Sequence, residues 1–396
     1  MKKCLLILPR DIFPINCGYS LKNQALIKSL SEKYRLTIIL ISDKGLSEDG
    51  ESFYNNYSEN FHFYKFSKWH FLFNVTISLF TKIPMQIGYY HFRKVQKKID
   101  SIINDFDIAI GALIRTYYYI YKANSGCVNV FDMVDSIGLN YLRSKRNVES
   151  IFWEIIYNIE TPRLLNYEKK FIRHSDVTYL FNPNEVDFWK QEGNVRWLPH
   201  GVNSELFSYD LVENKFKEYV AFIGKMDYRP NIDAVEWYVK NIHLNLKKRK
   251  PLIIVGANPV DSIKKLSSDY DDVIVTGFVE DPYIYLNSSS AVIAPMQTGG
   301  GIQNKVLEAM ALGKVVIMSS LAAAPIKGGD PEKHYLIANQ LNDYDDAFEK
   351  LKDHEACAKI MKNAKKLIED VYTWDNYSMY YIQGIESQIV VAQEPL

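Results

Sequence analysis

Short apolar runs alternate along the whole chain with longer stretches in which apolar residues recur at helical spacing. In the first half the apolar runs lie at residues 4–8, 36–41, 108–112, 128–131, 177–181 and 195–198. In the second half they lie at residues 219–223, 252–255, 273–276, 291–294 and 315–318. Strands that alternate with amphipathic helices are typical of parallel sheets covered by helices on both faces. The pattern therefore predicts an α/β fold made of two doubly wound, Rossmann-like domains.

The alternation loosens after Val202, in the stretch NSELFSYDLVENKFKE, and we place the linker between the domains there. We predict an N-terminal domain at residues 1–205, a second domain at 206–375, and a C-terminal helix at 376–396 that returns to the first domain. In open α/β sheets, ligands bind beyond the carboxyl ends of the strands. We therefore expect a ligand-binding cleft between the two domains.

Composition narrows the classes of ligand and the compartment. The 47 basic and 47 acidic side chains of the 396-residue chain cancel, which disfavours a nucleic-acid partner and favours a small or neutral substrate. The cysteines are scattered, without the spacing of a zinc site or the density of a disulfide scaffold, and are interpreted as reduced thiols of a cytoplasmic protein: Cys4, Cys17, Cys127 and Cys357. We expect neither a metal ion nor a cofactor. The start, MKKCLLILPRD, suits a first buried strand, and no run reaches the roughly 18 apolar residues of a membrane span.

Aromatic and basic residues interleave between residues 61 and 93. Phe63, Phe66, Trp69, Phe71, Phe73, Phe80, Tyr89 and Tyr90 alternate there with Lys65, Lys68, Lys82 and Arg93. One interpretation is a set of helices packed in the core with a solvated basic rim. The other is peripheral contact with a membrane, at the inner face of the plasma membrane, or with a lipid acceptor.

The strongest local signal is AVIAPMQTGGGIQNKVLEAMALGKVVI, which predicts a buried strand, a glycine turn, a helix and another strand. Glycines let the backbone approach a ligand closely, and amide N–H groups at the start of a helix favour an anion. A phosphate could thus be held by the turn residues Thr298, Gly299, Gly300, Gly301, Ile302 and Gln303. The alternative is a tight turn that binds no ligand.

The predicted helix after this turn places Lys305 and Glu308 on one face. A carboxylate within KVLEAMAL is costly to desolvate unless it accepts hydrogen bonds, and the paired hydroxyls of a ribose would satisfy both of its oxygens. The alternative is an intrahelical ion pair between Glu308 and Lys305.

These motifs carry a resemblance to a known family. GGGIQNKVLEAMALGKVVI resembles the donor-binding signature of GT-B glycosyltransferases of the glycosyltransferase 4 type. GKMDYRPNIDAVEWY, TGFVEDPYIYLNSSSAVIAP and VRWLPHGVNSELF resemble other landmarks of that group in the same order, whereas the first half resembles it only through PRDIFPINCGYSLKN and FDMVDS.

The resemblance implies a metal-independent transferase of cell-surface polysaccharide or glycan biosynthesis. It would move a sugar, with retention, from a nucleoside-diphosphate sugar to a hydroxyl of a saccharide or lipid-linked glycan. Two rival functions remain. One is a catalytically silent GT-B protein that binds a glycan or a partner, and the other is a sugar-nucleotide epimerase on the same fold.

By this resemblance, Glu308 matches the second glutamate of a Glu-x7-Glu pair that binds the ribose. The first glutamate falls at Gly300, so we expect backbone amides from Gly299 to Gln303 to contact the transferred sugar. The family's arginine position is occupied by Lys225, next to Gly224, and the lysine position five residues later by Pro230.

One diphosphate-binding cation of the family pattern is therefore missing. We expect Lys225 and Lys305 to act catalytically on the leaving diphosphate and Arg229 to assist in donor binding. For each of these cations the alternative is a solvated surface side chain. The Val279 backbone would face the nucleotide base, unless this segment is only a turn at the end of a strand.

In the first half, Gly18 closes the loop after the first strand, and the resemblance implies that this loop reaches toward the diphosphate. Ser20 is predicted to cap a helix at residues 21–30. Asp132 and Asp135 follow the strand at 128–131, and we assign Asp135 to acceptor hydroxyl binding or proton removal. The alternative for Asp135 is an ordinary helix cap.

Overall fold

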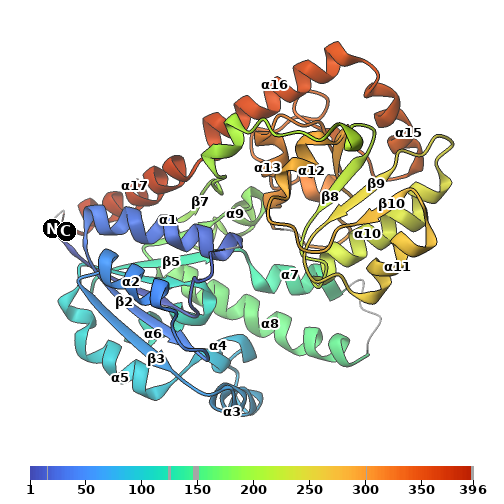
Figure 1. Ribbon diagram of the computed structural model, residues 1–396. Coiled ribbons are helices and arrows are strands. Elements are labelled where there is room, and N and C mark those ends of the chain that lie inside the picture. Colours follow the sequence, from blue (N-terminus) through green and yellow to red (C-terminus); the bar gives the residue numbers. More distant parts are fainter. Residues whose placement is uncertain (16, 124–125, 146–150, 300, 394–396) are drawn as a thin grey trace. The chain divides into compact units, whose positions relative to one another are not determined.

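The computed structural model describes residues 1–15, 17–123, 126–145, 151–299 and 301–393. Contacts divide the chain into two compact units, Met1–Leu198 with Trp374–Leu396, and Pro199–Thr373. The sequence placed the corresponding boundaries at 205/206 and 375/376, a few residues later. Each unit is built around one parallel sheet (Figure 1).

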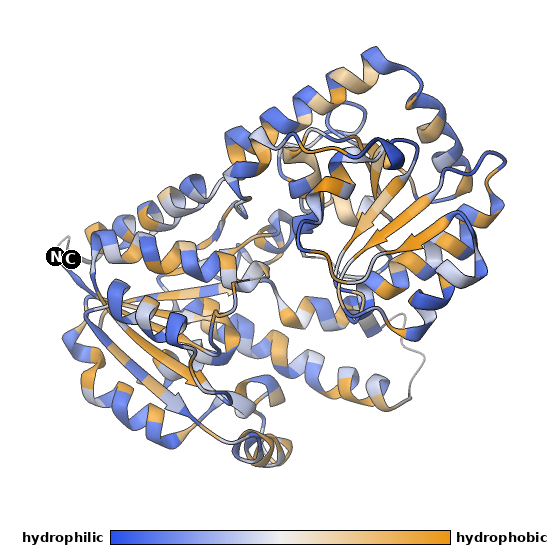
Figure 2. Ribbon diagram, viewed as in Figure 1, coloured by the Kyte–Doolittle hydropathy of each residue, from blue (hydrophilic) through white to orange (hydrophobic). Residues whose placement is uncertain are grey.

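The sheet of unit 1 has seven strands, ordered β3-β2-β1-β4-β5-β6-β7. Their bounds are β1 Lys3–Leu8, β2 Arg35–Ser42, β3 Asn60–Lys65, β4 Ile108–Ala112, β5 Val128–Val134, β6 Val177–Leu180 and β7 Val195–Trp197. The strand order reverses at β1, which pairs with both β2 and β4 in parallel register. The inner strands are apolar on both faces because helices cover both sides of a parallel sheet, and Figure 2 shows them as hydrophobic ribbons.

The helices of unit 1 lie around this sheet (Figure 1). They are α1 Gly18–Lys33, α2 Glu48–Tyr57, α3 Lys68–Leu79, α4 Met85–Tyr90, α5 Arg93–Ile102, α6 Leu113–Ala123, α7 Ile137–Ser144, α8 Ile151–His174, α9 Pro183–Trp189 and α17 Trp374–Gln393. The C-terminal helix α17 packs on α1 and β5. It buries Tyr377 and Tyr381, and the Tyr179 hydroxyl donates a hydrogen bond to the Tyr381 carbonyl at 2.8 Å. The last helix of the chain is thus part of the core of the first unit.

The sheet of unit 2 has six parallel strands, ordered β10-β9-β8-β11-β12-β13. Their bounds are β8 Val220–Ile223, β9 Leu252–Val255, β10 Val273–Val275, β11 Ala291–Ala294, β12 Val316–Met318 and β13 Leu336–Ile337. The helices are α10 Arg229–Asn241, α11 Asp261–Asp269, α12 Tyr283–Ser288, α13 Asn304–Ala311, α14 Ser320–Ala323, α15 Leu341–Lys350 and α16 His354–Val371. The predicted α/β class with two doubly wound sheets is confirmed.

Two local predictions in unit 1 are wrong. Helix α1 begins at Gly18 rather than after Ser20, because the Ser20 hydroxyl donates to the carbonyl of Pro14 at 3.3 Å instead of capping a helix. Asp132 does not follow the strand but lies within β5, where it is buried and forms an ion pair with Lys22 of α1. That ion pair joins α1 to the sheet.

The segment at residues 61–93 divides its aromatic residues between two environments. Phe71 and Phe92 enter the core of unit 1, where Phe66 stacks on Phe92 at 3.7 Å between ring centroids. Trp69 and Phe80, in contrast, are 79% and 90% exposed. Packing therefore accounts for only part of this aromatic cluster. No helix in the described part of the chain is both long and apolar enough to cross a bilayer.

Candidate functional site

The glycine turn between β11 and α13 contains a backbone conformation that glycine adopts without strain. Gly299 has a φ of +87°, in the left-handed region that disfavours a side chain. A Cβ at Gly299 would meet Pro230, the second residue of α10, at an ordinary contact distance of 3.7 Å. The turn thus lies beside the start of α10 within unit 2. Gly300, a predicted site residue, lies outside the described residues, while Thr298, Gly301 and Ile302 are half-buried.

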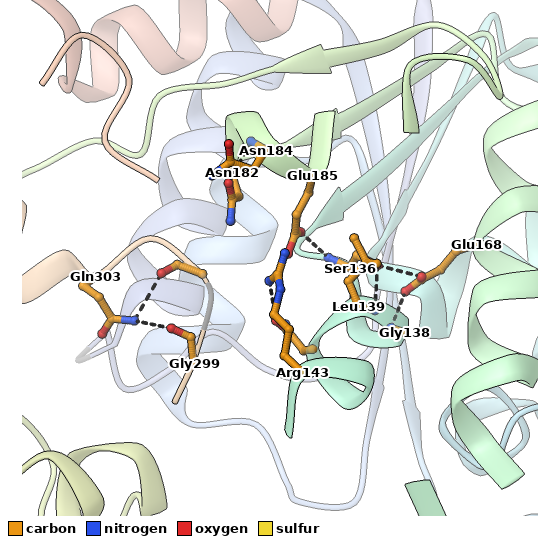
Figure 3. Close-up of polar contacts among 12 residues, drawn as sticks. Ser136, Gly138, Leu139, Arg143, Glu168, Asn182, Asn184, Glu185, Gly299 and Gln303 are labelled. Atoms are coloured by element: carbon orange, nitrogen blue, oxygen red, sulfur yellow. Dashed lines mark hydrogen bonds and ion pairs between the residues drawn. The ribbon is translucent and has the colours of Figure 1, made fainter. Parts of the chain in front are cut away.

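Gln303 precedes the first residue of α13 and closes the turn on itself. Its side-chain amide donates to the carbonyl of Gly301 at 3.1 Å and to that of Gly299 at 3.5 Å (Figure 3). It makes no side-chain cap bond to α13, and the first turn of that helix carries no acidic residue. The Gln303 side chain therefore does not cap the amide N–H groups at the start of α13. Uncapped amide groups at a helix start favour an anion.

Lys305, in the first turn of α13, is held by three neighbours in unit 2. Its ammonium donates to Asn231 Oδ1 at 2.5 Å, lies 3.7 Å from Met296 Sδ, and lies 4.4 Å from the centroid of the Phe222 ring. Burial lowers the pKa of Lys305 to about 7, although the nearby Glu308 charge opposes this shift. An anion at this position would restore the charged form of Lys305.

Glu308 is half-buried one turn further along α13. Burial raises the pKa of its carboxyl to about 7, while a hydrogen bond with the Tyr283 hydroxyl of α12 and the charge of Lys305 act in the opposite direction. A carboxylate has about four acceptor sites. Glu308 can therefore accept hydrogen bonds from ligand hydroxyls in addition to that of Tyr283.

Asn231 connects the predicted cations of unit 2. Its side chain donates to the carbonyl of Lys225 at 2.9 Å while accepting from Lys305, and a Cβ at Gly224 would lie 2.5 Å from its Nδ2. Glycine at position 224 is thus required by the close approach of this side chain. The sequence analysis did not single out Asn231. It is a polar residue of α10, and in the structure it is only 6% exposed.

Lys225 and Arg229, two of the predicted cations of unit 2, differ in their environment. The Lys225 side chain, after β8, is exposed. Arg229 is 74% exposed and pairs with Asp233 one turn along α10, with 2.7 Å from Nε to Oδ1. Lys225 is thus better placed to receive an anion than Arg229, whose charge Asp233 already balances.

Val279 lies in an apolar part of unit 2, packed against the cluster of Phe216, Ala221, Ile253 and Val255. It follows Gly277, whose φ is +70°. An open cavity of about 440 Å³ is lined here by Lys215, Phe216, Tyr219, Ile274, Thr276, Val279 and Tyr285. The side chain of Val279 therefore contributes to packing, and the contact of its backbone with the base stays a prediction.

In unit 1, Gly18 is the first residue of α1, and Asp135 follows β5. The alternative of Asp135 as a helix cap is wrong, because Ser136 caps α7 by accepting from the Leu139 N–H at 3.2 Å. Burial raises the pKa of Asp135 to about 6, with Arg143 acting against the shift. One carboxylate oxygen, Oδ1 of Asp135, is buried without a hydrogen-bond partner in the described part of the chain.

Two buried glutamates that the sequence did not reveal surround the start of α7 (Figure 3). Glu168 accepts from the Ser136 hydroxyl at 2.7 Å and the Gly138 N–H at 3.0 Å. Glu185 accepts from the Ser136 N–H at 2.7 Å and from Arg143 at 2.8 Å. Burial raises the pKa of Glu168 to about 8 and that of Glu185 to about 7. These carboxyls fix the turn that carries Asp135.

The structure therefore gathers Gly224, Lys225, Arg229, Lys305 and Glu308 with the glycine turn in unit 2, and places Gly18 and Asp135 in unit 1. Among the residues that the structure describes, no group of three or more His, Cys, Asp or Glu side chains is arranged to hold a metal ion.

Known sequences resemble this chain over part of its length. Residues 217–354 match the family model described as glycosyl transferases group 1. An uncharacterized 44.6 kDa protein in the cps region of Klebsiella pneumoniae is 26% identical over 62% of this chain. An uncharacterized glycosyltransferase of Methanocaldococcus jannaschii is 25% identical over 60% of this chain. The chain spans 63% and 59% of the lengths of these two curated relatives.

Solved structures resemble the whole chain. Sucrose-phosphate synthase from Thermosynechococcus elongatus matches 99% of this chain and 100% of its own, with a TM-score of 0.71 and 14% identity. Anabaena HepE in complex with UDP matches 97% of this chain and 100% of its own, with a TM-score of 0.64 and 11% identity. At such identity the likeness shows the fold. The chain has the GT-B fold, and its residues 217–354 match the family model of glycosyl transferases group 1.

Proposed function

We propose that this protein transfers a sugar from a nucleoside-diphosphate sugar to a hydroxyl of a saccharide or lipid-linked glycan. The observation that carries the proposal is the glycine turn before α13, with Lys305 and Glu308 on the helix that follows. The whole arrangement lies inside the segment that matches the family model.

The leaving diphosphate would lie against the turn amides and the start of α13. Negative charge accumulates on that leaving group as the bond to the sugar breaks, so donors aimed at it stabilise the transition state more than the ground state. Lys305 and Lys225 would supply the cations. The pKa of Lys305 is about 7. The negative charge of an adjacent diphosphate would favour the protonated form of this side chain.

The nucleoside would be held by two contacts in unit 2. Glu308 would accept hydrogen bonds from the ribose hydroxyls, and the Val279 backbone would face the base. Anabaena HepE has been solved with UDP and with UDP-glucose, which supports uridine-diphosphate sugars as the first donors to test.

The acceptor would be bound by unit 1, with Asp135 receiving an acceptor hydroxyl through its unpartnered oxygen. The relative from the cps region of Klebsiella pneumoniae supports a role in polysaccharide synthesis. Retention of anomeric configuration, with the leaving phosphate accepting the proton, belongs to the proposal by family resemblance. Metal independence and a cytoplasmic location, with peripheral attachment to the membrane, belong to it as well.

The test begins with a thermal-shift screen of nucleoside diphosphates and their sugars. A ligand at 100 times its dissociation constant stabilises the folded protein by about 2.7 kcal/mol. Release of nucleoside diphosphate is then measured with saccharide acceptors. Release that depends on an acceptor supports transfer. Binding without release favours a silent GT-B protein, and conversion of the donor without an acceptor favours an epimerase.

A further inference from the structure

Helix α3 of unit 1 turns an apolar face toward solvent. Trp69, Phe73, Ile77 and Phe80, at the end of the helix, follow one another at spacings of three or four residues, and Leu72 comes three residues after Trp69, so these five residues lie on one face. The two outermost aromatics, Trp69 and Phe80, are 79% and 90% exposed, and the other three are exposed as well. We call these five residues the α3 stripe.

The opposite side of α3 is fixed to unit 1, so the helix cannot turn the α3 stripe inward. Phe71 packs on Tyr89 and Phe92 with ring centroids 4.7 and 4.8 Å away. The Asn74 amide donates to the carbonyl of His91 at 3.0 Å. Ser78 is buried against Gly88, where a Cβ would lie only 2.6 Å from that of Ser78. The exposure of the α3 stripe is therefore a built feature of the fold.

The segment of the chain that contains the α3 stripe is strongly basic although the whole chain is neutral. Residues 60–99 contain seven Lys and Arg and no Asp or Glu. Lys65, Lys68 and Lys82, closest to the α3 stripe along the chain, are exposed. A helix with a solvent-facing apolar stripe, terminal aromatics and flanking lysines is the pattern of interfacial helices that lie on lipid. Clustered lysines are attracted to anionic headgroups.

We propose that α3 is a docking site for the surface of an anionic lipid bilayer. The α3 stripe enters the boundary between headgroups and acyl chains, and the lysines contact lipid phosphates. A second copy of this chain is a poorer occupant, because a twofold interface would oppose one basic segment to its own copy. This proposal specifies the peripheral membrane attachment of the proposed function, and it does not depend on the donor site, which lies in unit 2.

Unit 1 carries a second set of exposed apolar residues. Phe152, Trp153, Ile155 and Ile159 lie in the first half of α8 and are exposed. Helix α4 packs on α3 and is joined to α8, because the Met85 N–H donates to Glu160 at 2.7 Å. The two exposed sets thus belong to one connected part of unit 1.

Sedimentation with vesicles tests the proposal on the full chain. The probes are phosphatidylcholine vesicles with and without about 30 mol% phosphatidylglycerol, at about 0.1 M and about 0.5 M salt. We expect binding to the anionic vesicles that weakens at high salt. No binding to anionic vesicles, or equal binding to both kinds, overturns the proposal.

Two variants with matched controls locate the contact. The triple variant Trp69→Ser, Phe73→Ser, Phe80→Ser should weaken vesicle binding by about tenfold or more. The control Phe188→Ser, Leu211→Ser, Val212→Ser removes apolar side chains that are exposed elsewhere and should bind as the unchanged protein does. Likewise, Lys65→Gln, Lys68→Gln, Lys82→Gln should weaken binding, whereas Lys240→Gln, Lys247→Gln, Lys248→Gln should not.

Folding and self-association are measured on the same samples. Unchanged thermal unfolding of the triple variant shows that its loss of vesicle binding is not misfolding. If it unfolds, the lysine variant, which removes no packed side chain, decides the result by the same criterion. The unchanged protein could instead form a dimer that binds no vesicles and that becomes monomeric in the triple variant. That result assigns the α3 stripe to a second copy and contradicts the proposal.

Discussion

The two units present opposite chemistry where a strand passes into a helix. In unit 2, the turn from β11 to α13 is rich in glycine, ends on a helix without a side-chain cap from Gln303, and is followed by Lys305. In unit 1, the turn from β5 to α7 is capped by Ser136 and lined with the carboxyls of Asp135, Glu168 and Glu185. The first turn favours an anion, and the second would repel one.

This difference suggests which ligand each unit binds. A diphosphate fits the backbone amides and cations of unit 2. A neutral hydroxyl fits the carboxyl-lined turn of unit 1, because the buried Oδ1 of Asp135 has no partner in the described chain and can accept a hydrogen bond. The same doubly wound architecture thus supports two binding chemistries through the residues of one turn.

The largest expected effect concerns the nucleoside side of unit 2. Glu308→Ala should weaken donor binding by about 100-fold and remove the thermal shift given by the nucleoside diphosphate, because two hydrogen bonds to a charged acceptor are lost. The control Glu369→Ala changes an exposed acid on α16 and should leave the shift intact. An unchanged shift in Glu308→Ala removes Glu308 from the donor site.

The next effect concerns the acceptor side of the comparison. Asp135→Asn should lower turnover by about 100-fold, the usual range for a group that binds or moves a proton, while donor affinity stays unchanged. Steady-state kinetics and donor titration separate the two quantities. Asp49→Asn, an exposed change on α2, is the control. A loss of donor affinity in Asp135→Asn would contradict the division of ligands between the units.

A smaller effect is expected for the exposed cation of unit 2. Lys225→Ala should lower turnover about tenfold with little change in donor affinity, because its contact strengthens only as the diphosphate leaves. Lys240→Ala, at an exposed position of α10, is the matched control. A change confined to donor affinity would show that Lys225 binds the donor without acting in the reaction.

The smallest effect is a pH dependence. Donor binding should require protonated Lys305 and ionised Glu308, and both pKa values are about 7. Affinity for an intact nucleotide sugar, whose diphosphate does not titrate near neutrality, should pass through a maximum near pH 7. Lys305→Gln should abolish the fall on the alkaline side and keep the fall on the acidic side. Calorimetric titration across pH measures both limbs, and an unaltered alkaline fall would exclude Lys305.

Glu308 and Lys305 should also change the stability of the folded protein, in different pH windows and in opposite directions. The raised pKa of Glu308 makes the folded state lose stability as pH rises from its usual 4.5 to about 7. The lowered pKa of Lys305 makes stability rise between about 7 and its usual 10.5, because the unfolded chain then binds the extra proton. Unfolding midpoints of Glu308→Gln and Lys305→Gln across pH separate these contributions.

The sequence predicted the fold and the family-like turn because both depend on local patterns. Continuous apolar runs indicated buried parallel strands, and Gly299 indicated a left-handed backbone. What the sequence missed depends on side chains brought together from distant positions. Asn231 reaches Lys305 across 74 positions, and Glu185 reaches Ser136 across 49. No spacing rule covers such contacts.

The helix caps were predicted wrongly because the side chains have other hydrogen-bond partners or because a neighbouring residue forms the cap. Ser20 was predicted as a helix cap, but its hydroxyl is bonded to Pro14, and Ser136 rather than Asp135 caps α7. For the residues at 61–93 the sequence allowed either core packing with a solvated basic rim or contact with a membrane or lipid acceptor. The structure buries Phe71 of α3 and exposes Trp69 of the same helix, so packing alone does not explain the segment.

A structure of the protein with a bound nucleoside diphosphate tests the central claim most directly. We predict that the distal phosphate lies against the amides that open α13, with the Lys305 ammonium beside it and the ribose hydroxyls on Glu308. A nucleotide bound elsewhere, or a turn before α13 that side chains fill when the nucleotide is present, would contradict the assignment of the donor to unit 2.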